Sequence, residues 1–376
     1  SAANQTISVK TADEFVRALG PDRTIVIATT APLNITEAID KMIALGHLNE
    51  GPTYYNPETA GTVTSTVTYG GNTDGNGLQV RGCENLTIRA KKGMATLLAT
   101  PRYVNVLEFI HCNNIKLENI VMGHTEGGYC DKGVIEFDGC TNILINDCDF
   151  FGCGTEGFVF ENCNHVSVNR SCVHDCTYYT MHITGCQQVR FNDCTFRNNK
   201  EYNQLNVQVS NDVAFTGCVF DCLEGEMFNF DEYVGFYNCV FRNCQVEPIS
   251  SRFAPQGSAV LAYCTTMFGD APVGKPDAAK PKFKLGRWTD GTSTYILTQV
   301  EPYRYLFTSV DDPSEAFAVN CFSAQDNDYM TGSEFPFTNT VGCLSVDIIK
   351  KDGKDYIRIL DDGHEPIKSF FYLGKK

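Results

Sequence analysis

Apolar and polar residues alternate in short runs along the middle of the chain. Apolar pairs two positions apart recur about every 23 residues, as in Ile143/Ile145, Val166/Val168 and Val189/Phe191. Such a period of two is typical of β-strands, whereas a helix repeats every 3.6 residues. A second set of alternating runs, such as Ile135/Phe137, precedes these pairs. Each repeat is therefore predicted to hold two or three short strands, with no room for a helix of ten residues.

Cysteines recur with the same period. The first column contains Cys83, Cys112, Cys140, Cys163 and Cys186, followed by Ser210 and Asp231. We assign a second column to Cys148, Cys172, Cys194, Cys218 and Cys239, with Phe150, His174, Phe196, Phe220 and Phe241 two residues later. Equivalent positions on parallel strands lie roughly 4.8 Å apart, slightly beyond the roughly 3.5–4.5 Å between Cβ atoms in a disulfide. We therefore expect most of these cysteines to be reduced, inert and inward-facing.

A column of alternating charge supports the same register. It is predicted to contain Asp175, Arg197, Asp221 and Arg242 on four successive repeats, facing outward. Opposite charges on neighbouring strands attract, so we interpret this column as structural.

These repeats predict a coil of parallel strands. A leucine-rich repeat would contain a helix or its Leu-Asn signature, and a propeller blade needs roughly 40 residues or more. In a coil, side chains at equivalent positions stack on successive turns of the chain.

The two ends of the chain follow other patterns. Residues 1–75 are predicted to form an N-terminal cap and first coil, with a capping box at Thr11–Glu14, a strand over 23–27 and a second helix over 36–45. The coils are expected over 76–270. Residues 271–281 are interpreted as a linker or a crossing segment, and 282–376 are predicted to form an antiparallel β module with a hairpin turn at 351–354.

Composition narrows the classes of partner. The 376 residues carry a net charge of −15, which argues against binding to nucleic acid or to an anionic membrane surface. No stretch approaches the roughly 20 apolar residues of a membrane span. The start at Ser-Ala-Ala is compatible with a leader already removed. We expect a secreted, periplasmic or cell-surface monomer whose partners are glycans or cations.

Acidic side chains gather on the strand that precedes the first cysteine column. Its outward positions, turn by turn, are Gln79/Arg81, Glu108/Ile110, Glu136/Asp138, Val159/Glu161, His182/Thr184 and Asn206/Gln208. Four carboxylates on three neighbouring turns are unfavourable unless a cation, a substrate hydroxyl or a raised pKa relieves them. This surface is our leading candidate site.

The turn before that strand adds acids and aromatic residues. They are Asp131, Lys132, Glu156, Tyr178, Tyr179, Tyr202 and Glu224. Aromatic faces pack against sugar rings, and carboxyl groups handle hydroxyls and the glycosidic oxygen. The alternative is that an acidic protein simply has acidic faces.

Repeats such as residues 133–148 resemble the right-handed parallel β-helix superfamily of pectate lyases and polygalacturonases. The resemblance covers roughly residues 7–265. It implies an all-β fold: a right-handed parallel β-helix with an N-terminal helix and strand cap and a C-terminal antiparallel β module. The similarity specifies the fold strongly and the chemistry weakly.

Two chemistries follow from the resemblance. Similarity to inverting polygalacturonases implies catalytic acids at Asp131 and Glu156, although the paired aspartates, Gly-His-Gly and Arg-x-Lys of that family are absent. The match of 72–75 to a short motif of that family gives Asp74 little weight. Similarity to pectate lyases implies Ca²⁺ bound by carboxylates and a basic residue, for which Lys132 is the nearby candidate. The implied Ca²⁺ ligands are Glu108, Glu136, Asp138 and Glu161.

The histidines differ in expected role. His174 is interpreted as a hydrogen-bonded core residue, and His182, facing outward, as the better acid or base. His124 and Glu126 lie in the insertion 123–131, which we expect to be a loop that contributes to the site. Cys130 is a lone loop cysteine, which is usually not a nucleophile.

Three functions remain open from the sequence. The first is a polysaccharide lyase or glycoside hydrolase with Asp131, Glu136, Glu156 and His182 as acids and bases. The second is a non-catalytic glycan-binding or surface protein, and the third is a structural rod without a ligand.

Overall fold

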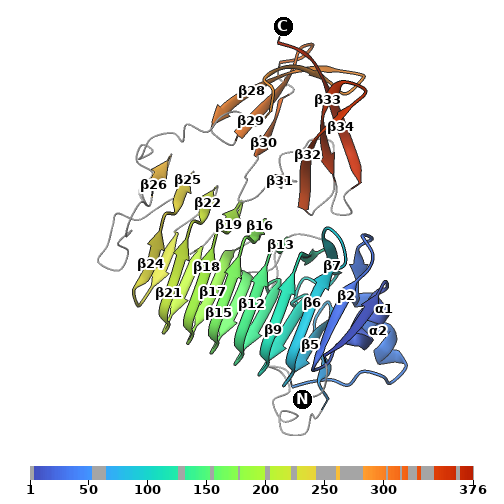
Figure 1. The fold of residues 1–376 in the computed structure, drawn as a ribbon, viewed down its shortest axis with the longest axis vertical. Coiled ribbons are helices and arrows are strands. Elements are labelled where there is room, and N and C mark those ends of the chain that lie inside the picture. The colour runs from blue at the N-terminus through green and yellow to red at the C-terminus, as the bar shows by residue number, and fades with distance from the viewer. Residues whose placement is uncertain are drawn as a thin grey trace. The chain divides into compact units, whose positions relative to one another are not determined.

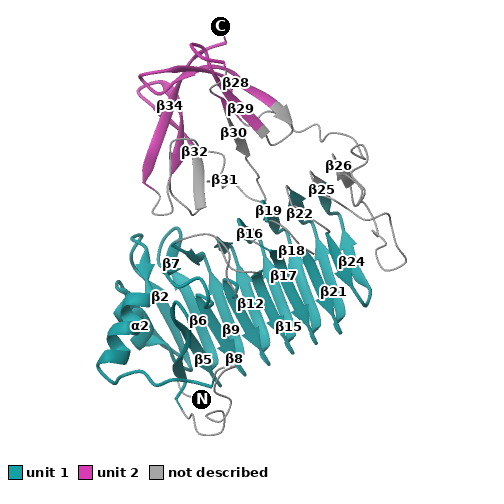
Figure 2. Cartoon of the chain, turned by 180° about the vertical axis from the view of Figure 1, so that it is seen from behind, with its two compact units in different colours: residues 1–273 teal, residues 274–376 magenta. Residues whose placement is uncertain are grey.

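A computed structural model of the chain describes residues 4–52, 65–125, 132–152, 156–176, 178–199, 204–221, 227–242, 260–262, 283–301, 304–313, 316–320, 328–331, 343–360 and 365–375. Contacts divide the chain into two compact units, residues 1–273 and 274–376 (Figure 2). The predicted linker at 271–281 lies outside the described residues.

The first unit is a coil of three sheets, in which each turn of the chain from β5 to β25 adds one strand to each sheet (Figure 1). The first sheet comprises β4 (Val67–Asn72), β5 (Gly75–Arg81), β8 (Leu107–Ile110), β11 (Ile135–Asp138), β14 (Glu156–Glu161), β17 (Tyr179–Thr184), β20 (Leu205–Gln208) and β23 (Phe228–Phe230). Its strands are parallel except for the antiparallel pair β4 and β5.

The second sheet continues each turn. It comprises β1 (Gln5–Val9), β2 (Arg23–Ile27), β6 (Glu84–Ala90), β9 (Asn113–Glu118), β12 (Thr141–Asn146), β15 (Asn164–Asn169), β18 (Gln187–Asn192), β21 (Asn211–Thr216) and β24 (Val234–Tyr237). The third sheet comprises β3 (Leu33–Asn34), β7 (Ala95–Ala99), β10 (Ile120–His124), β13 (Asp149–Phe151), β16 (Cys172–His174), β19 (Thr195–Arg197), β22 (Val219–Asp221), β25 (Val240–Arg242) and β26 (Val260–Ala262). The predicted coil of parallel strands is confirmed.

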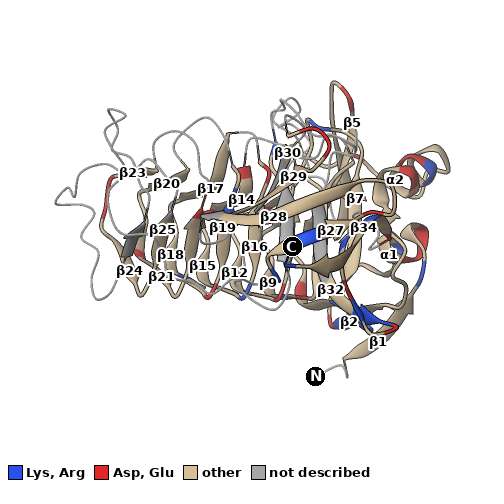
Figure 3. Cartoon of the chain, turned by 90° about the horizontal axis from the view of Figure 1, so that it is seen from above, with Lys and Arg blue, Asp and Glu red and all other residues tan. Residues whose placement is uncertain are grey.

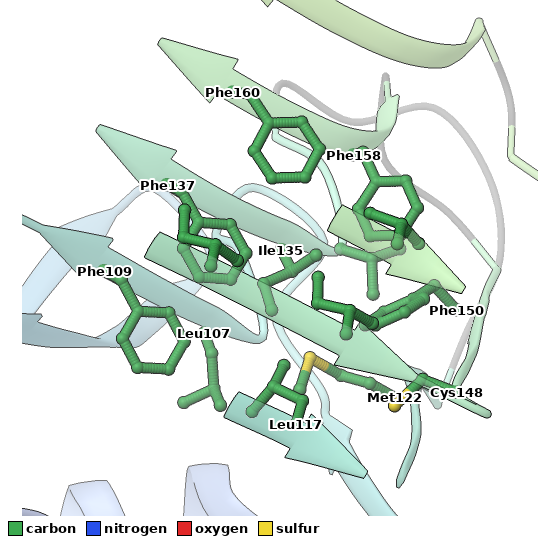
Figure 4. Packing of buried hydrophobic residues seen from close by; sticks show 14 of the residues in the cluster. Leu107, Phe109, Leu117, Met122, Ile135, Phe137, Cys148, Phe150, Phe158 and Phe160 are labelled. Atoms are coloured by element: carbon green, nitrogen blue, oxygen red, sulfur yellow. The ribbon is translucent and has the colours of Figure 1, made fainter. Parts of the chain in front are cut away.

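Inward side chains form stacks along the coil. Phe109, Phe137 and Phe160 lie on successive strands of the first sheet, with ring centroids 5.0 Å and 5.4 Å apart in nearly parallel planes (Figure 4). The alternating apolar positions therefore place one ring above the next, and burial of this apolar surface stabilises the coil.

The N-terminal cap contains two helices, α1 (Ala12–Ala18) and α2 (Ile35–Ala44). The backbone N–H of Glu14 donates to the Thr11 hydroxyl, and the Glu14 carboxylate accepts from the backbone N–H of Lys10. These bonds satisfy donors at the start of α1, as expected of a capping box. Phe15 and Ile39 are fully buried in the core of the coil.

The second unit contains one antiparallel sheet. Its strands are β27 (Gly286–Thr289), β28 (Thr294–Glu301), β29 (Arg304–Ser309), β30 (Ala316–Asn320), β31 (Asp328–Thr331), β32 (Cys343–Lys351), β33 (Lys354–Leu360) and β34 (Pro366–Gly374). Asp352 and Gly353 both have positive φ in the predicted hairpin between β32 and β33. The core of this unit includes Trp288, Tyr305 and Phe370.

The turns of the coil use left-handed backbone at fixed positions. Gly82, His111, Gly139, Asn162, Gly185 and Val209 all have positive φ just after the strands of the first sheet. A second set with positive φ, Gly152, Asp175 and Asn198, follows β13, β16 and β19. Asp175 is therefore a turn residue and not a strand residue.

The second cysteine column differs from the prediction. Cys148 is in register with Ser171, because Asp149 pairs with Cys172, and the column continues through Cys194, Cys218 and Cys239. The backbone N–H of Cys148 donates to the Ser171 hydroxyl, 3.1 Å away. Assigning Cys172 to this column was wrong, because the equivalent residue stands three positions after the preceding apolar pair.

The same one-residue shift corrects two neighbouring columns. Val173, not His174, lies between Phe150 and Phe196, and His174, not Asp175, lies between Phe151 and Arg197. The pairing of Arg197 with Asp221 and of Asp221 with Arg242 is as predicted. A shift of one residue moves a side chain to the other face of a sheet, so Cys172 and His174 face outward.

Candidate functional site

The predicted outward positions of the first sheet are in register. Glu136 pairs with Glu108 on one side and Val159 on the other, and Val159 pairs with His182. The adjacent column continues from Asp138 to Glu161. We call the surface formed by Glu108, Glu136, Asp138, Glu161 and His182 the acidic face. Figure 3 shows acidic segments close to β14, which lies in this sheet.

Glu136 is a strongly perturbed carboxyl group of this face. Glu136 is 7% exposed, and one of its carboxylate oxygens accepts a hydrogen bond of 2.7 Å from the side-chain amide of Asn105. Burial and the neighbouring charge of Glu108 raise its pKa from 4.5 to about 7, against the opposing effect of Lys132. A carboxyl group with this pKa carries a proton near neutral pH and can donate it.

Glu108 lies directly beside it on β8. Burial raises the pKa of Glu108. The positive charges of Lys132 and Arg81 and a hydrogen bond donated by Gln79 partly offset this rise. The Arg81 guanidinium donates to Thr68, Gln79 and the carbonyl of Pro52. Arg81 is thus already held by the protein.

Lys132 supplies a positive charge at the edge of the face. Its Nζ lies 3.8 Å from a carboxylate oxygen of Glu136, and the side chain is about half exposed. Asp131, Glu126, Tyr202, Glu224 and Cys130 lie outside the described residues.

His182 and Glu156 form a second pair of titratable groups. Nδ1 of His182 lies 3.8 Å from a carboxylate oxygen of Glu156. Glu156 and, more weakly, Glu161 and Glu136 raise the pKa of His182 against the effect of burial. Tyr179 is in register with Glu156, and Tyr178 and Tyr179 are both half-buried. The structure thus groups a proton donor, Glu136 on β11, with an acid–base pair on the next two strands, Glu156 on β14 and His182 on β17.

The proposed Ca²⁺ ligands are not gathered at a common point. Among the described residues, the metal-compatible group with ligand atoms within 4.8 Å of one another is Asp149, Cys172 and His174. The four carboxylates Glu108, Glu136, Asp138 and Glu161 form no such group in this part of the chain.

His124 does not lie in a surface loop, as the sequence had suggested. It is the last residue of β10 and is 1% exposed, with its ring nitrogens 2.9 Å and 3.1 Å from the carbonyl oxygens of Val104 and Gly152. Burial lowers its pKa. Asp74 accepts hydrogen bonds from the backbone of Arg102 and Tyr103 and fixes a turn. Both residues have structural roles.

A second group of polar residues lies on the outward face of the third sheet, and it brings Asp149 and Cys172 beside the predicted outward charged column, in which His174 stands. We call Asp149, Cys172, His174, Asp175 and Arg197 the buried polar cluster. His174 is fully buried, with Nε2 2.6 Å from Asp149 and Nδ1 2.5 Å from Asp175. Burial lowers the pKa of His174, but the upward effect of the two carboxylates is larger, so the net shift of the pKa is upward. The prediction of a hydrogen-bonded histidine holds, but its inward placement was wrong.

No described helix has the length and apolar character of a membrane span.

Residues 58–220 match the family model described as "Right handed beta helix region". No curated protein matches. Similar solved structures include a pectate lyase (pelN) from Paenibacillus sp. 0602, with a TM-score of 0.40 and 12% identity, over 74% of this chain and 82% of that one.

Two further similar structures differ in kind. A putative glycosyl hydrolase from Parabacteroides merdae has a TM-score of 0.27 and 18% identity, over 50% of this chain and 88% of that one. The surface protein and adhesin PfbA from Streptococcus pneumoniae has a TM-score of 0.29 and 9% identity, over 71% and 75%. Scores this low carry no argument about chemistry.

Proposed function

Because the coil is a right-handed parallel β-helix whose first sheet carries the acidic face, we propose that the protein binds a polysaccharide along this face and hydrolyses it. The observation that carries the proposal is Glu136, a nearly buried carboxyl group whose pKa is raised to about 7 beside a second carboxyl group. One fold can carry many unrelated functions, so the proposal rests on the residues of the acidic face and not on the fold.

Glu136 acts as the general acid. Burial and the adjacent Glu108 keep its proton in place near neutral pH, and protonation of the glycosidic oxygen makes the leaving group neutral. The Asn105 amide holds the carboxyl group in one orientation. Asn105 is therefore a positioning residue.

His182 and Glu156 activate water. His182 lies two strands from Glu136, which corresponds to roughly 10 Å between Cα positions. This spacing leaves room for a sugar ring and a water molecule, as an inverting mechanism requires. Val159 lies between them and offers a small apolar surface for the ring.

Hydrolysis of a neutral glycan fits this face better than elimination from an acidic one. Carboxylates surround the site, and the substrate carboxylate of a lyase needs a bound cation or free basic residues nearby. The described carboxylates of this face do not bring three ligand atoms within 4.8 Å of one another. Arg81 is held by Thr68, Gln79 and Pro52, and Lys132 lies 3.8 Å from Glu136. From this substrate class we also propose that the protein acts outside the cytoplasm, as a secreted, periplasmic or cell-surface protein. That it is a monomer is a separate part of the proposal.

The test is a screen of neutral and acidic oligosaccharides for new reducing ends and for unsaturated products. We expect new reducing ends, and Glu136→Gln should lower kcat by about 10²- to 10⁴-fold. Glu84→Gln, at an exposed acid in the second sheet, is the matched control and should keep the activity.

Three outcomes would contradict the proposal. Unsaturated products would indicate a lyase. Binding without any product would indicate the alternative function of a glycan-binding protein. Full activity of Glu136→Gln would remove Glu136 from the mechanism.

A further inference from the structure

Cys172 differs from the other cysteines whose side chains the structure describes. The other ten belong to the hydrophobic core of the coil, whereas Cys172 is 6% exposed and outside that core. The register of β13, β16 and β19 places it between Asp149 and Thr195 on the outward face. Core packing therefore does not explain this thiol.

Three chemically different ligand atoms meet at this position. A carboxylate oxygen of Asp149, Sγ of Cys172 and a ring nitrogen of His174 all lie within 4.8 Å of one another, and all three residues are buried. Oxygen, nitrogen and sulfur donors in one small group are typical of Zn²⁺, which binds carboxylate, imidazole and thiolate in tetrahedral sites.

Asp175 holds His174 in the orientation that a metal ligand needs. Nδ1 lies 2.5 Å from the Asp175 carboxylate, so Nε2 is directed to Asp149, 2.6 Å away. Histidine ligands usually donate their second ring N–H to a carboxylate, which fixes the ring and raises its basicity. The left-handed turn conformation of Asp175 places its carboxylate there.

Thr195 provides an independent observation. It is the neighbour of Cys172 in the same outward column, it is 2% exposed, and its hydroxyl has no hydrogen-bond partner in the structure. A buried hydroxyl without a partner is unfavourable. A water molecule in the fourth position of a tetrahedral ion at this site would give it one.

We propose that Asp149, Cys172 and His174 bind Zn²⁺, that Asp175 orients His174, and that water completes the coordination. On binding, the ion displaces the proton of the Cys172 thiol and the proton between Nε2 of His174 and Asp149. One Zn²⁺ thus replaces two protons, and the net charge of the cluster is unchanged. The ion joins β13 to β16, two neighbouring strands of the third sheet.

Arg197 defines the competing explanation. It is fully buried, its positive charge acts on both Cys172 and His174, and it pairs in register with Asp221. These residues could form a network of buried ion pairs that needs no metal. The two explanations differ in whether the cluster takes up Zn²⁺.

The experiment uses the full chain, treated with a chelator under reducing conditions and titrated with Zn²⁺ alone against a chromophoric chelator. We expect one tightly bound equivalent, and Co²⁺ in its place should give the charge-transfer absorption of thiolate coordination. Cys172→Ser should abolish that absorption and weaken Zn²⁺ binding more than Asp175→Asn does. Asp175→Asn should lower the affinity for Zn²⁺ by about 10- to 100-fold, which is typical when a residue that orients a metal ligand is replaced.

Cys194→Ser is the matched control, because Cys194 is a buried core cysteine whose register neighbour Ser171 is already serine. It should keep both the absorption and the affinity. Should Cys172→Ser fail to fold by circular dichroism, Asp149→Asn tests the same site and should also weaken binding. No Zn²⁺ uptake by the full chain, or thiolate absorption that persists in Cys172→Ser, would overturn the proposal.

Discussion

On the acidic face, Glu108 and Glu136 are register neighbours of like charge, whereas in the buried polar cluster His174 lies between two aspartates and beside Arg197. Both groups stand on the outside of the same coil, on its strands and, for Asp175, on the turn after β16. On the acidic face, burial and like charge raise the pKa of Glu136 and oppose its ionisation. In the cluster, opposite charges compensate one another. Removing a charge from the acidic face should therefore stabilise the folded protein, whereas removing one from the buried polar cluster should destabilise it.

The largest effect is expected from His174→Gln. The variant removes both contacts to carboxylates and leaves the charge of Asp149 buried, which costs about 3–5 kcal/mol. Urea unfolding followed by circular dichroism measures the change. The control His182→Gln, at a partly exposed histidine, should change stability by no more than about 0.5 kcal/mol. Equal effects of the two variants would contradict the comparison.

Glu136→Gln should act in the opposite direction and depend on pH. The unfolded carboxyl group ionises near 4.5 and the folded one near 7, so the folded state binds more protons between these values. The free energy of unfolding therefore falls as the pH rises from about 4.5 to 7, by up to roughly 3 kcal/mol at about 1.4 kcal/mol per pKa unit.

The glutamine variant lacks this dependence, because it has no proton to lose. Unfolding measured at pH 4 and pH 8 should show it clearly more stable than the parent only at pH 8. Glu84→Gln, at an exposed acid, should follow the parent at both values. Destabilisation of Glu136→Gln at pH 8 would show that the raised pKa has no energetic consequence.

Val209→Asn separates backbone strain from charge. Val209 directly follows β20, is 70% exposed and has a φ of 51°, which is unfavourable for a β-branched residue by about 1–2 kcal/mol. Asparagine tolerates this conformation and occupies the equivalent turn at Asn162. We expect a gain of about 1 kcal/mol in thermal or urea unfolding. The reverse change Asn162→Val should cost a similar amount, and a neutral result for both would exclude strain at these turns.

The smallest effect concerns His182. Glu156→Gln should lower the pKa of His182, because Glu156 is the main cause of its upward shift. A titration of the imidazole by NMR measures it. Glu161→Gln should give a smaller decrease in this pKa, because Glu161 acts on His182 through its charge alone and more weakly than Glu156 does. A larger decrease with Glu161→Gln would reassign the partner of His182.

The register of the acidic face could be predicted because two signals agree there. The apolar pairs Ile135/Phe137 and Phe158/Phe160 and the cysteines that follow them keep one spacing, so the outward residues between them align. Near β16 the two signals disagree. Counting three residues from Val168 leads to Ser171, while residue type favours Cys172. Spacing predicts the register better than residue type does. The backbone of a strand fixes the alternation of its side chains, whereas more than one small residue can fill the same inward position.

The raised pKa of Glu136 and the polar cluster had weaker signals in the sequence. Asn105 precedes β8 in an irregular segment, and nothing in its spacing indicates a contact with Glu136. The alternating repeat likewise does not reveal that His174, Arg197 and Asp149 are buried although they face outward.

By itself, the sequence determined the coil: alternation with a period of two predicts strands, and a recurring pattern of strands and cysteines predicts that each turn lies on the one before. It also determined which acids share a column. Only the tertiary structure decided which of them are buried, which keep a proton and which meet a histidine or a thiol. The reason is that strand pattern depends on neighbours along the chain, whereas desolvation and charge interactions depend on distances in space.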